Sequence, residues 1–234
     1  WFVDYNTENF DADNGKMIGT LRIPCFLKHN NEFVDSRYIL KSTLEYVGKE
    51  LLAEMKKEGS VPGLACDPKE IEEIVFTSAT ELEFWTKTPR ENVSTTDLSS
   101  SQVMQEQYWQ RTRGNVRTSL EQAVQTLNLY GLNPEMGHKE VGGVRGQLDE
   151  NGNMTHVNEQ LEIDWRFSTP LQAADNEILV RSVVKEIFRS NGLEVSFQAK
   201  PIFGVAGSGE HTHVGIAARL KDGKIINHMS PADM

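Results

Sequence analysis

Two histidines in the sequence have a spacing that suits ligand binding. His211 and His213 follow a Gly-x-Gly turn in the stretch Gly-Ser-Gly-Glu-His-Thr-His that starts at Gly207. Residues i and i+2 of a strand share a face, so we expect both imidazoles to project from one side of a sheet. The glycines let the backbone approach a ligand closely. The pair alone does not separate a ligand site from a solvated polar face.

Carboxylates recur at the same spacing on a second predicted strand. Glu81 and Glu83 alternate with apolar residues between Ile74 and Lys87, which places both carboxylates on one strand face. Such a pair is often only a solvated face. Like charges that lie side by side repel each other, however, unless water, an arginine or a cation lies between them.

A predicted hairpin adds two more carboxylates. Asn151-Gly152 between two extended runs is the strongest hairpin signal in the chain. Glu162 takes the polar face of the second run, residues 156–167, and Glu140 near the start of the first run can reach the same side. One polar sheet face would then gather Glu81, Glu83, Glu140, Glu162, His211 and His213.

This set of side chains indicates hard divalent cations. Carboxylate oxygens favour Mg²⁺ or Mn²⁺ over zinc, and the imidazoles bias one position toward Mn²⁺. Two such metals are the usual means of handling phosphates, because they neutralise the charge on the transferring and leaving oxygens. The pattern therefore predicts a two-metal site for phosphoryl transfer.

Helical patterns alternate with the strands that must position these residues. We expect helices over residues 35–59, 103–130 and 170–190, and residues 103–113 can also be read as a separate shorter helix. The last helix has an apolar stripe that includes Ile178 and Phe188. Further strands are expected over residues 20–27, 193–199 and 210–220. The expected fold class is α+β, with a curved, mostly antiparallel sheet and helices packed on its outer face.

The composition narrows the function classes. The chain has 234 residues and a formal net charge of -10, which argues against nucleic-acid or anionic-membrane partners and suits cation binding. No apolar run is long enough to cross a bilayer, and no signal-peptide pattern opens the chain. Cys25 and Cys66 offer no disulfide framework. We expect a soluble, cytoplasmic protein.

The motif segments resemble glutamine synthetase in order and spacing. They are Thr80-Glu-Leu-Glu-Phe84, His138-Lys-Glu-Val141, Gln160-Leu-Glu162 leading into Arg166-Phe-Ser-Thr169, and Lys200-Pro-Ile-Phe-Gly-Val-Ala-Gly-Ser-Gly-Glu-His-Thr-His213. The resemblance is to the front part of the catalytic domain only, in a divergent, type III-like form. It implies that residues 1–34 lead into the catalytic domain and that residues 35–234 form an incomplete one, in which the family's partial barrel supplies the curved sheet.

The resemblance also implies a role for each matching residue. Glu83, Glu140 and Glu162 match the ligands of the metal beside glutamate, and Glu81 and His211 match ligands of the metal beside the ATP phosphates. His213 matches a histidine near the transferring phosphate, which makes it the candidate catalytic and nucleotide-binding residue. Glu135 matches a glutamate on the nucleotide side. Gly207 matches a glycine that approaches the substrate, next to Ala206.

The implied reaction is the synthesis of glutamine. ATP phosphorylates the γ-carboxylate of glutamate, and ammonia then attacks the acyl phosphate. Mg²⁺ or Mn²⁺, two or three ions in all, would be the cofactors, and ATP, glutamate and ammonia the substrates. The resemblance further implies a large ring-shaped homo-oligomer.

Two positions depart from the family pattern. Ala206 replaces an asparagine that holds the amino-acid end of the substrate, and Glu210 precedes His211 where a small or apolar residue is usual. Either departure is consistent with an altered acceptor. This leaves open a γ-glutamyl ligase for another amine or a related phosphotransferase. Two further alternatives, independent of these departures, are a zinc hydrolase that uses His211 and His213 and a non-catalytic homologue.

The resemblance implies that parts of the family's site lie outside these 234 residues. They are the amino-terminal β-grasp domain, an arginine-bearing segment and the last metal-ligand glutamate. We therefore predict that this chain alone binds metal weakly and turns over nothing. A coupled assay of ADP release checks this, and glutamate-dependent release would contradict it.

Overall fold

The computed structural model describes residues 2–60, 66–93, 108 and 110–227. The chain divides into two compact units, Trp1–Tyr46 and Val47–Met234. Within the described ranges, none of the helices combines the length and the apolar character that a membrane crossing requires.

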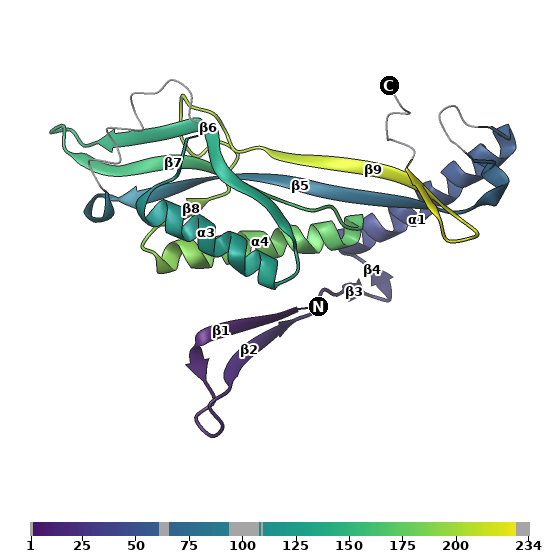
Figure 1. Cartoon of the computed structure of the whole chain (residues 1–234), viewed down its shortest axis with the longest axis horizontal. Coiled ribbons are helices and arrows are strands. Elements are labelled where there is room, and N and C mark those ends of the chain that lie inside the picture. The colour runs from purple at the N-terminus through teal and green to yellow at the C-terminus, as the bar shows by residue number, and fades with distance from the viewer. Residues whose placement is uncertain (1, 61–65, 94–107, 109, 228–234) are drawn as a thin grey trace. The chain divides into compact units, whose positions relative to one another are not determined.

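The first unit contains two small antiparallel pairs of strands, drawn in purple and blue in Figure 1. The pairs are β1 (Phe2–Phe10) with β2 (Met17–Arg22), and β3 (Lys28–His29) with β4 (Glu32–Phe33). β2 ends ahead of Pro24, as expected for a residue that cannot donate a ladder hydrogen bond.

The helix α1 (Ser36–Glu58) begins in the first unit and ends in the second. Asp35 caps it, because the Asp35 Oδ1 accepts a hydrogen bond from the Tyr38 N–H at 2.8 Å. The Asp35 Oδ2 accepts another from the Leu27 N–H at 2.7 Å. The ring of Phe33 stacks on that of Tyr38 with centroids 4.0 Å apart.

The second unit is built on one antiparallel sheet. The strands run in the order β10-β9-β5-β7-β6, and the short β8 also pairs with β5. Their bounds are β5 (Ile71–Pro89), β6 (Pro134–Leu148), β7 (Met154–Trp165), β8 (Glu194–Ser196), β9 (Glu210–Leu220) and β10 (Ile225–Asn227). The 3₁₀ turns η1 (Pro68–Glu70) and η2 (Arg90–Asn92) flank β5.

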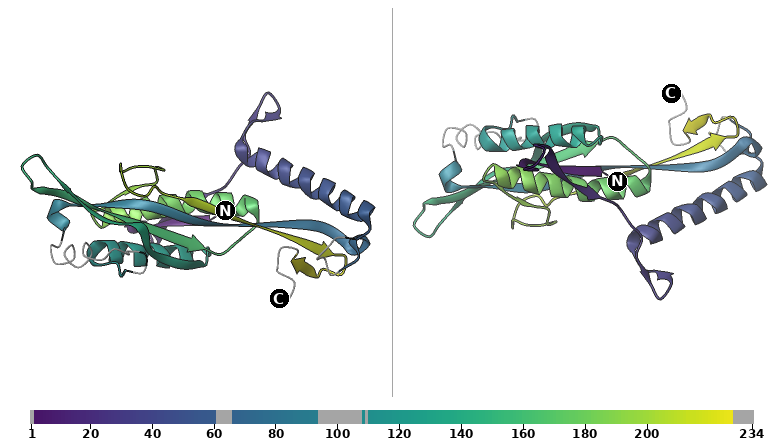
Figure 2. Two further views of the ribbon diagram at one scale, coloured as in Figure 1. Left: turned by 90° about the horizontal axis from the view of Figure 1, so that it is seen from above. Right: turned by 90° about the horizontal axis from the view of Figure 1, so that it is seen from below.

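Two helices cover one face of this sheet. α3 (Gly114–Leu129) and α4 (Pro170–Ser190) lie side by side against β5 and β6, as the views in Figures 1 and 2 agree. The Thr169 side chain caps α4, and Pro170 occupies its first turn. The opposite face of the sheet is left for the polar side chains of the strands.

The main core lies between the sheet and these helices. Phe84 on β5 and Phe188 on α4 are both fully buried, and their rings meet edge to face at 5.5 Å between centroids. Leu161 and Ile163 of β7 are also fully buried. A second cluster joins Met55 of α1 to Ile71, Ile74 and Ala218 at the other end of the sheet.

The structure confirms the α+β class and most of the expected elements, and it moves some boundaries. The second expected helix begins at Gly114; of the possible separate helix over residues 103–113, residues 103–107 and 109 lie outside the described residues. β8 covers only residues 194–196 of the strand expected over 193–199. Ile178, expected on the apolar stripe of α4, is 69% exposed because it lies on the outer side of the helix.

We predict that Phe188→Ala destabilises the protein by about 3–5 kcal/mol, because the smaller side chain leaves a cavity beside Phe84. Chemical denaturation followed by circular dichroism measures this change. The matched control is Ile178→Ala in the same helix, for which we expect less than about 0.5 kcal/mol. Equal losses in the two variants would contradict the assigned packing.

Candidate active site

The register of the sheet brings the predicted site residues together on the face opposite α3 and α4. Glu81 of β5 lies beside His211 of β9, and Glu83 lies beside Glu162 of β7. On the other side of β7, Glu162 pairs with His138 of β6. Alternation along each strand then points these side chains away from the core.

Three carboxylates form the buried centre of this face. Glu83, Glu140 and Glu162 are 9%, 6% and 6% exposed, and each offers an oxygen atom within 4.8 Å of the others. Burial, together with the neighbouring Glu162 and Glu83, raises the pKa of Glu140. A hard divalent cation fits such a set of oxygen donors, and it would offset their mutual repulsion.

A second group lies one step along β5. The Glu81 carboxylate joins both predicted histidines, with Oε2 3.0 Å from the His211 Nδ1 and Oε1 2.7 Å from the His213 Nε2. The hydrogen bond that the His211 ring donates to the Glu81 carboxylate raises the pKa of His211. The expectation that the two imidazoles share a face is confirmed, and the carboxylate between them holds both.

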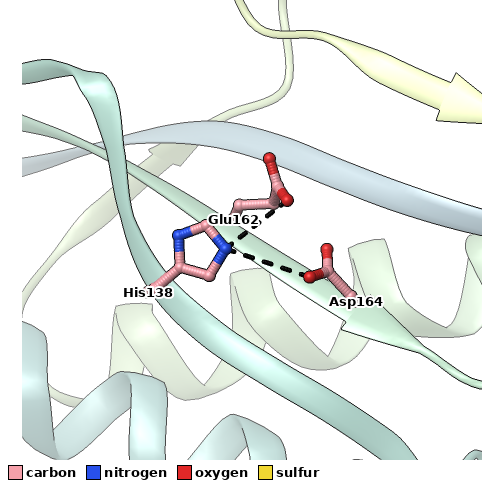
Figure 3. A group of neighbouring side chains, drawn as sticks. All are labelled: His138, Glu162 and Asp164. Atoms are coloured by element: carbon pink, nitrogen blue, oxygen red, sulfur yellow. Dashed lines mark ion pairs between the residues drawn. The ribbon is translucent and has the colours of Figure 1, made fainter. Parts of the chain in front are cut away.

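A third group includes two residues that were absent from the predicted set. The His138 Nε2 lies 3.5 Å from Glu162 Oε1 and 3.9 Å from Asp164 Oδ2 (Figure 3). These three side chains also form a group that could hold a metal ion. Spacing in the sequence could have identified both residues. His138 lies two residues before Glu140, and Asp164 lies two residues after Glu162, each on the same strand face.

The charges in this third group are strongly coupled. The hydrogen bond with Glu162 raises the pKa of His138 to about 9. Burial, followed by the neighbouring Glu162, raises the pKa of Asp164 to about 7. Burial alone would also raise the pKa of Glu162, but its hydrogen bonds with His138 and Asp164 lower it. The group therefore shares protons at neutral pH.

Tyr108 was also missed by the sequence analysis. Its ring lies 4.9 Å from that of His138 between centroids. Desolvation and the charge of Glu162 raise the pKa of the phenol, so Tyr108 stays a neutral hydrogen-bond donor beside the carboxylates.

The glycine loop before β9 is tied to the buried carboxylates. The Gly209 N–H donates to Glu83 Oε2 at 2.9 Å, and the Glu83 N–H donates to the Gly209 carbonyl at 3.2 Å. A Cβ on residue 209 would lie 2.6 Å from Glu83 Oε1, so this close approach requires glycine. The loop therefore lies directly against the candidate metal ligands.

The remaining predicted residues lie at the margin of these groups. The Gly207 carbonyl faces the site and accepts a hydrogen bond from Gln160. Ala206 is half-buried, next to Val205, whose carbonyl accepts a hydrogen bond from Lys200. Glu135 is exposed at a shift in the pairing of β6 with β7, and within the described residues it makes no ion pair with the buried carboxylates.

The Glu210 side chain does not face the candidate site, although Glu210 is next to His211 in the sequence. It pairs with Leu82 of β5, so its side chain lies on the helix side of the sheet. There the Arg181 Nη2 donates to Glu210 Oε2 at 2.6 Å, and the Arg181 Nε donates to Glu177 Oε1 at 2.5 Å. This carboxylate binds α4 instead of facing the site, so the position of Glu210 gives no support to an altered acceptor.

Taken together, the carboxylates and imidazoles on this face of the antiparallel sheet could hold divalent metal ions. The family model of the glutamine synthetase catalytic domain matches residues 35–227. The chain therefore belongs to the glutamine synthetase family, the glutamate–ammonia ligases, whose members use ATP and divalent metal ions.

Individual relatives match over shorter segments. Glutamine synthetase of Pyrococcus horikoshii is 35% identical over 97 residues, which is 42% of this chain and 18% of that protein. The enzyme of Clostridium saccharobutylicum is 45% identical over 65 residues, 28% of this chain and 14% of its own length. These matches thus span less than a fifth of the relatives.

A solved structure supports the fold. The cryoEM structure of Plasmodium falciparum glutamine synthetase superposes with a TM-score of 0.54 and 22% sequence identity, covering 91% of this chain and 39% of that one. Similarity at this identity shows the shared fold alone.

The coupled charges predict how stability depends on pH without divalent ions. Asp164 has a pKa of about 7 when folded against an ordinary 3.8, so the folded state binds more protons between these pH values. The free energy of unfolding therefore falls as pH rises through this window. His138 acts in the same sense between 6.5 and about 9. We expect Asp164→Asn to remove the fall in the free energy of unfolding between pH 3.8 and about 7.

Urea denaturation in a chelating buffer at several pH values measures this effect. The quantity that matters is the difference between the wild type and Asp164→Asn, because other carboxylates titrate in both proteins. A difference that stays constant from pH 4 to 7 would contradict the burial of a protonated Asp164.

Proposed function

We propose that the whole protein ligates ammonia to the γ-carboxylate of L-glutamate with ATP, through a γ-glutamyl phosphate, to give glutamine. The observation that carries this proposal is the adjacency of two ligand groups on one sheet face. Glu83 belongs to the buried group and Glu81 to the histidine group, and they are two residues apart on β5. Such adjacency suits two cations that act on one phosphoryl group.

The residues of this chain divide between the two ends of the reaction. We assign Glu83, Glu140 and Glu162 to a metal beside glutamate, and Glu81 with His211 to a metal beside the ATP phosphates. Bound Mg²⁺ or Mn²⁺ would offset the repulsion between the carboxylate and the triphosphate. This assignment is supported by the oxygen donors in the first group and by the mixed carboxylate and imidazole donors in the second.

The other side chains bind and orient the reactants. His213 is held by Glu81 and is assigned to the transferring phosphate, and the exposed Glu135 to the nucleotide. Gly207 and Ala206 are assigned to the amino-acid end of glutamate. Positioning of this kind supplies much of the acceleration in phosphoryl transfer.

The covalent steps balance without a further reactant. A γ-carboxylate oxygen attacks the terminal phosphorus of ATP, the bond to the bridging oxygen breaks, and ADP leaves. The ammonia nitrogen then attacks the γ-carbon and expels phosphate, and the nitrogen loses a proton. In this family loops around the intermediate keep water away, and Gly209 of the glycine loop lies against Glu83.

A second candidate function keeps the same chemistry and changes the acceptor. Ala206 stands where the family usually has an asparagine that holds the substrate, so an amine other than ammonia stays open as the acceptor. Comparing ammonia with polyamines as substrates of the whole protein distinguishes the two. A strong preference for ammonia removes this candidate.

We also propose that the whole protein works in the cytoplasm as a large homo-oligomer. Membership of the glutamine synthetase family supports this. Light scattering after size-exclusion chromatography tests the assembly, and a monomer at micromolar concentration would contradict it.

We predict that Glu83→Gln in the whole protein lowers kcat/KM at least about 100-fold, because one charged ligand is lost from the buried group. Production of ADP and glutamine measures the activity. The matched control is Glu73→Gln on the same strand, since the Glu73 carboxylate is exposed and binds Arg219 at 2.7 Å, away from the site. An active Glu83→Gln variant, or equal losses in both, would count against the assignment.

A further inference from the structure

Gln160 lies at the centre of the candidate site, although the sequence pattern singled it out only as part of a motif. It lies on β7 opposite Trp85 of β5, and its side chain is fully buried. A buried amide has four hydrogen-bonding positions to satisfy, and each unsatisfied one costs stability. The hydrogen-bond partners of the Gln160 amide therefore indicate its structural role.

Three partners fix the orientation of the amide. The Gly142 N–H can only donate, and it lies 2.6 Å from Gln160 Oε1. The Glu83 Oε2 and the Gly207 carbonyl can only accept, and they lie 2.8 Å and 2.7 Å from Gln160 Nε2. A flipped amide would place donor against donor and acceptor against acceptor. The amide is thus locked by one donor and two acceptors.

The first consequence concerns the Glu83 carboxylate. Its Oε2 receives hydrogen bonds from both Gln160 and the Gly209 N–H. Within the described part of the chain, Oε1 accepts none, so it is the oxygen left for a cation. Two donors on one oxygen prevent the carboxylate from rotating, which fixes the direction in which Oε1 points.

The second consequence concerns the glycine loop. The same Nε2 that holds Glu83 also donates to the Gly207 carbonyl, so one amide group joins a candidate metal ligand to a candidate substrate contact. A carbonyl oxygen has two lone pairs, which leaves the Gly207 oxygen able to accept a hydrogen bond from a ligand as well.

A bulge in β6 supplies the third partner. Between the pairs Lys139–Leu161 and Val144–Glu159, residues 140–143 of β6 lie opposite Gln160 alone. This bulge brings the Gly142 N–H onto the amide and Glu140 into the buried group. A Cβ on Gly142 would overlap Gln160 Oε1 and the Trp85 ring, so the arrangement leaves no room for a side chain there.

We propose that Gln160 is a positioning residue that orients the Glu83 carboxylate and the Gly207 carbonyl together, so that metal affinity and amino-acid affinity depend on one amide. This inference rests on the proposed function. It deepens that function by coupling the two binding events through a side chain that touches neither the metal nor the reacting atoms.

Two variants of the whole protein test this coupling. Gln160→Met keeps the volume and removes the hydrogen bonds. Gln160→Glu keeps an acceptor for Gly142 but removes the donors and adds a charge. The probe is Mn²⁺ alone, measured by calorimetry or electron paramagnetic resonance, followed by the KM for glutamate. We expect Mn²⁺ binding to weaken about 10-fold to 100-fold in both variants, with a raised KM for glutamate.

The matched control is Thr86→Val on β5. Thr86 is fully buried, and its hydroxyl donates to the Glu194 carbonyl at 3.2 Å on the helix side of the sheet. The control should lose a similar amount of stability with Mn²⁺ affinity unchanged within about twofold. Equal weakening of Mn²⁺ binding in Thr86→Val would overturn the proposal, because the effect would then follow from stability alone.

The charged variant separates positioning from electrostatics. If charge alone governed the site, Gln160→Glu would bind Mn²⁺ more tightly, and tighter or unchanged binding would overturn the proposal. If Gln160→Met does not fold, Gln160→Glu decides the question. A wild type that binds Mn²⁺ but ligates nothing refutes the proposed function and still leaves the Mn²⁺ comparison valid. A wild type that binds no Mn²⁺ overturns both.

Discussion

The register of β5 against its two long neighbours, β9 and β7, is the constraint on which the site depends. β5 pairs with β9 along one part of its length and with β7 along another, and Glu81 and Glu83 lie where the two pairings meet. A slip of one residue would turn these carboxylates into the core and Phe84 out of it. The packing of Phe84 on α4 therefore holds the register, and with it the geometry of the site.

Burial of several carboxylates on one face requires compensation, and the chain provides more than one kind. Protons on His138 and Asp164 form hydrogen bonds that stabilise the Glu162 carboxylate. Hydrogen bonds from Gln160 and Gly209 stabilise the Glu83 carboxylate. The Val141 N–H donates to Glu140 Oε2 at 2.7 Å. Each carboxylate thus has its own support in the absence of a cation.

Much of the fold could be predicted because strands and helices of this chain follow their periods closely. α4 and β9 have the predicted bounds, and alternation along β5 and β7 correctly places Glu83 and Glu162 on one polar face. Alternation also contained the orientation of Glu210, since a neighbour of His211 on a strand must face the other way. The bulge around Gly142 could not be predicted, because it depends on a close contact with a residue distant in sequence.

The shared protons near His138 have a consequence for the thermodynamics of metal uptake. With pKa values of about 9 for His138 and about 7 for Asp164, this corner holds protons at neutral pH in the absence of a cation. A divalent ion bound beside Glu162 would favour the deprotonated forms of both groups, so its binding would release protons. The observed heat of metal binding will therefore vary with the ionisation enthalpy of the buffer, and its slope counts the protons that leave.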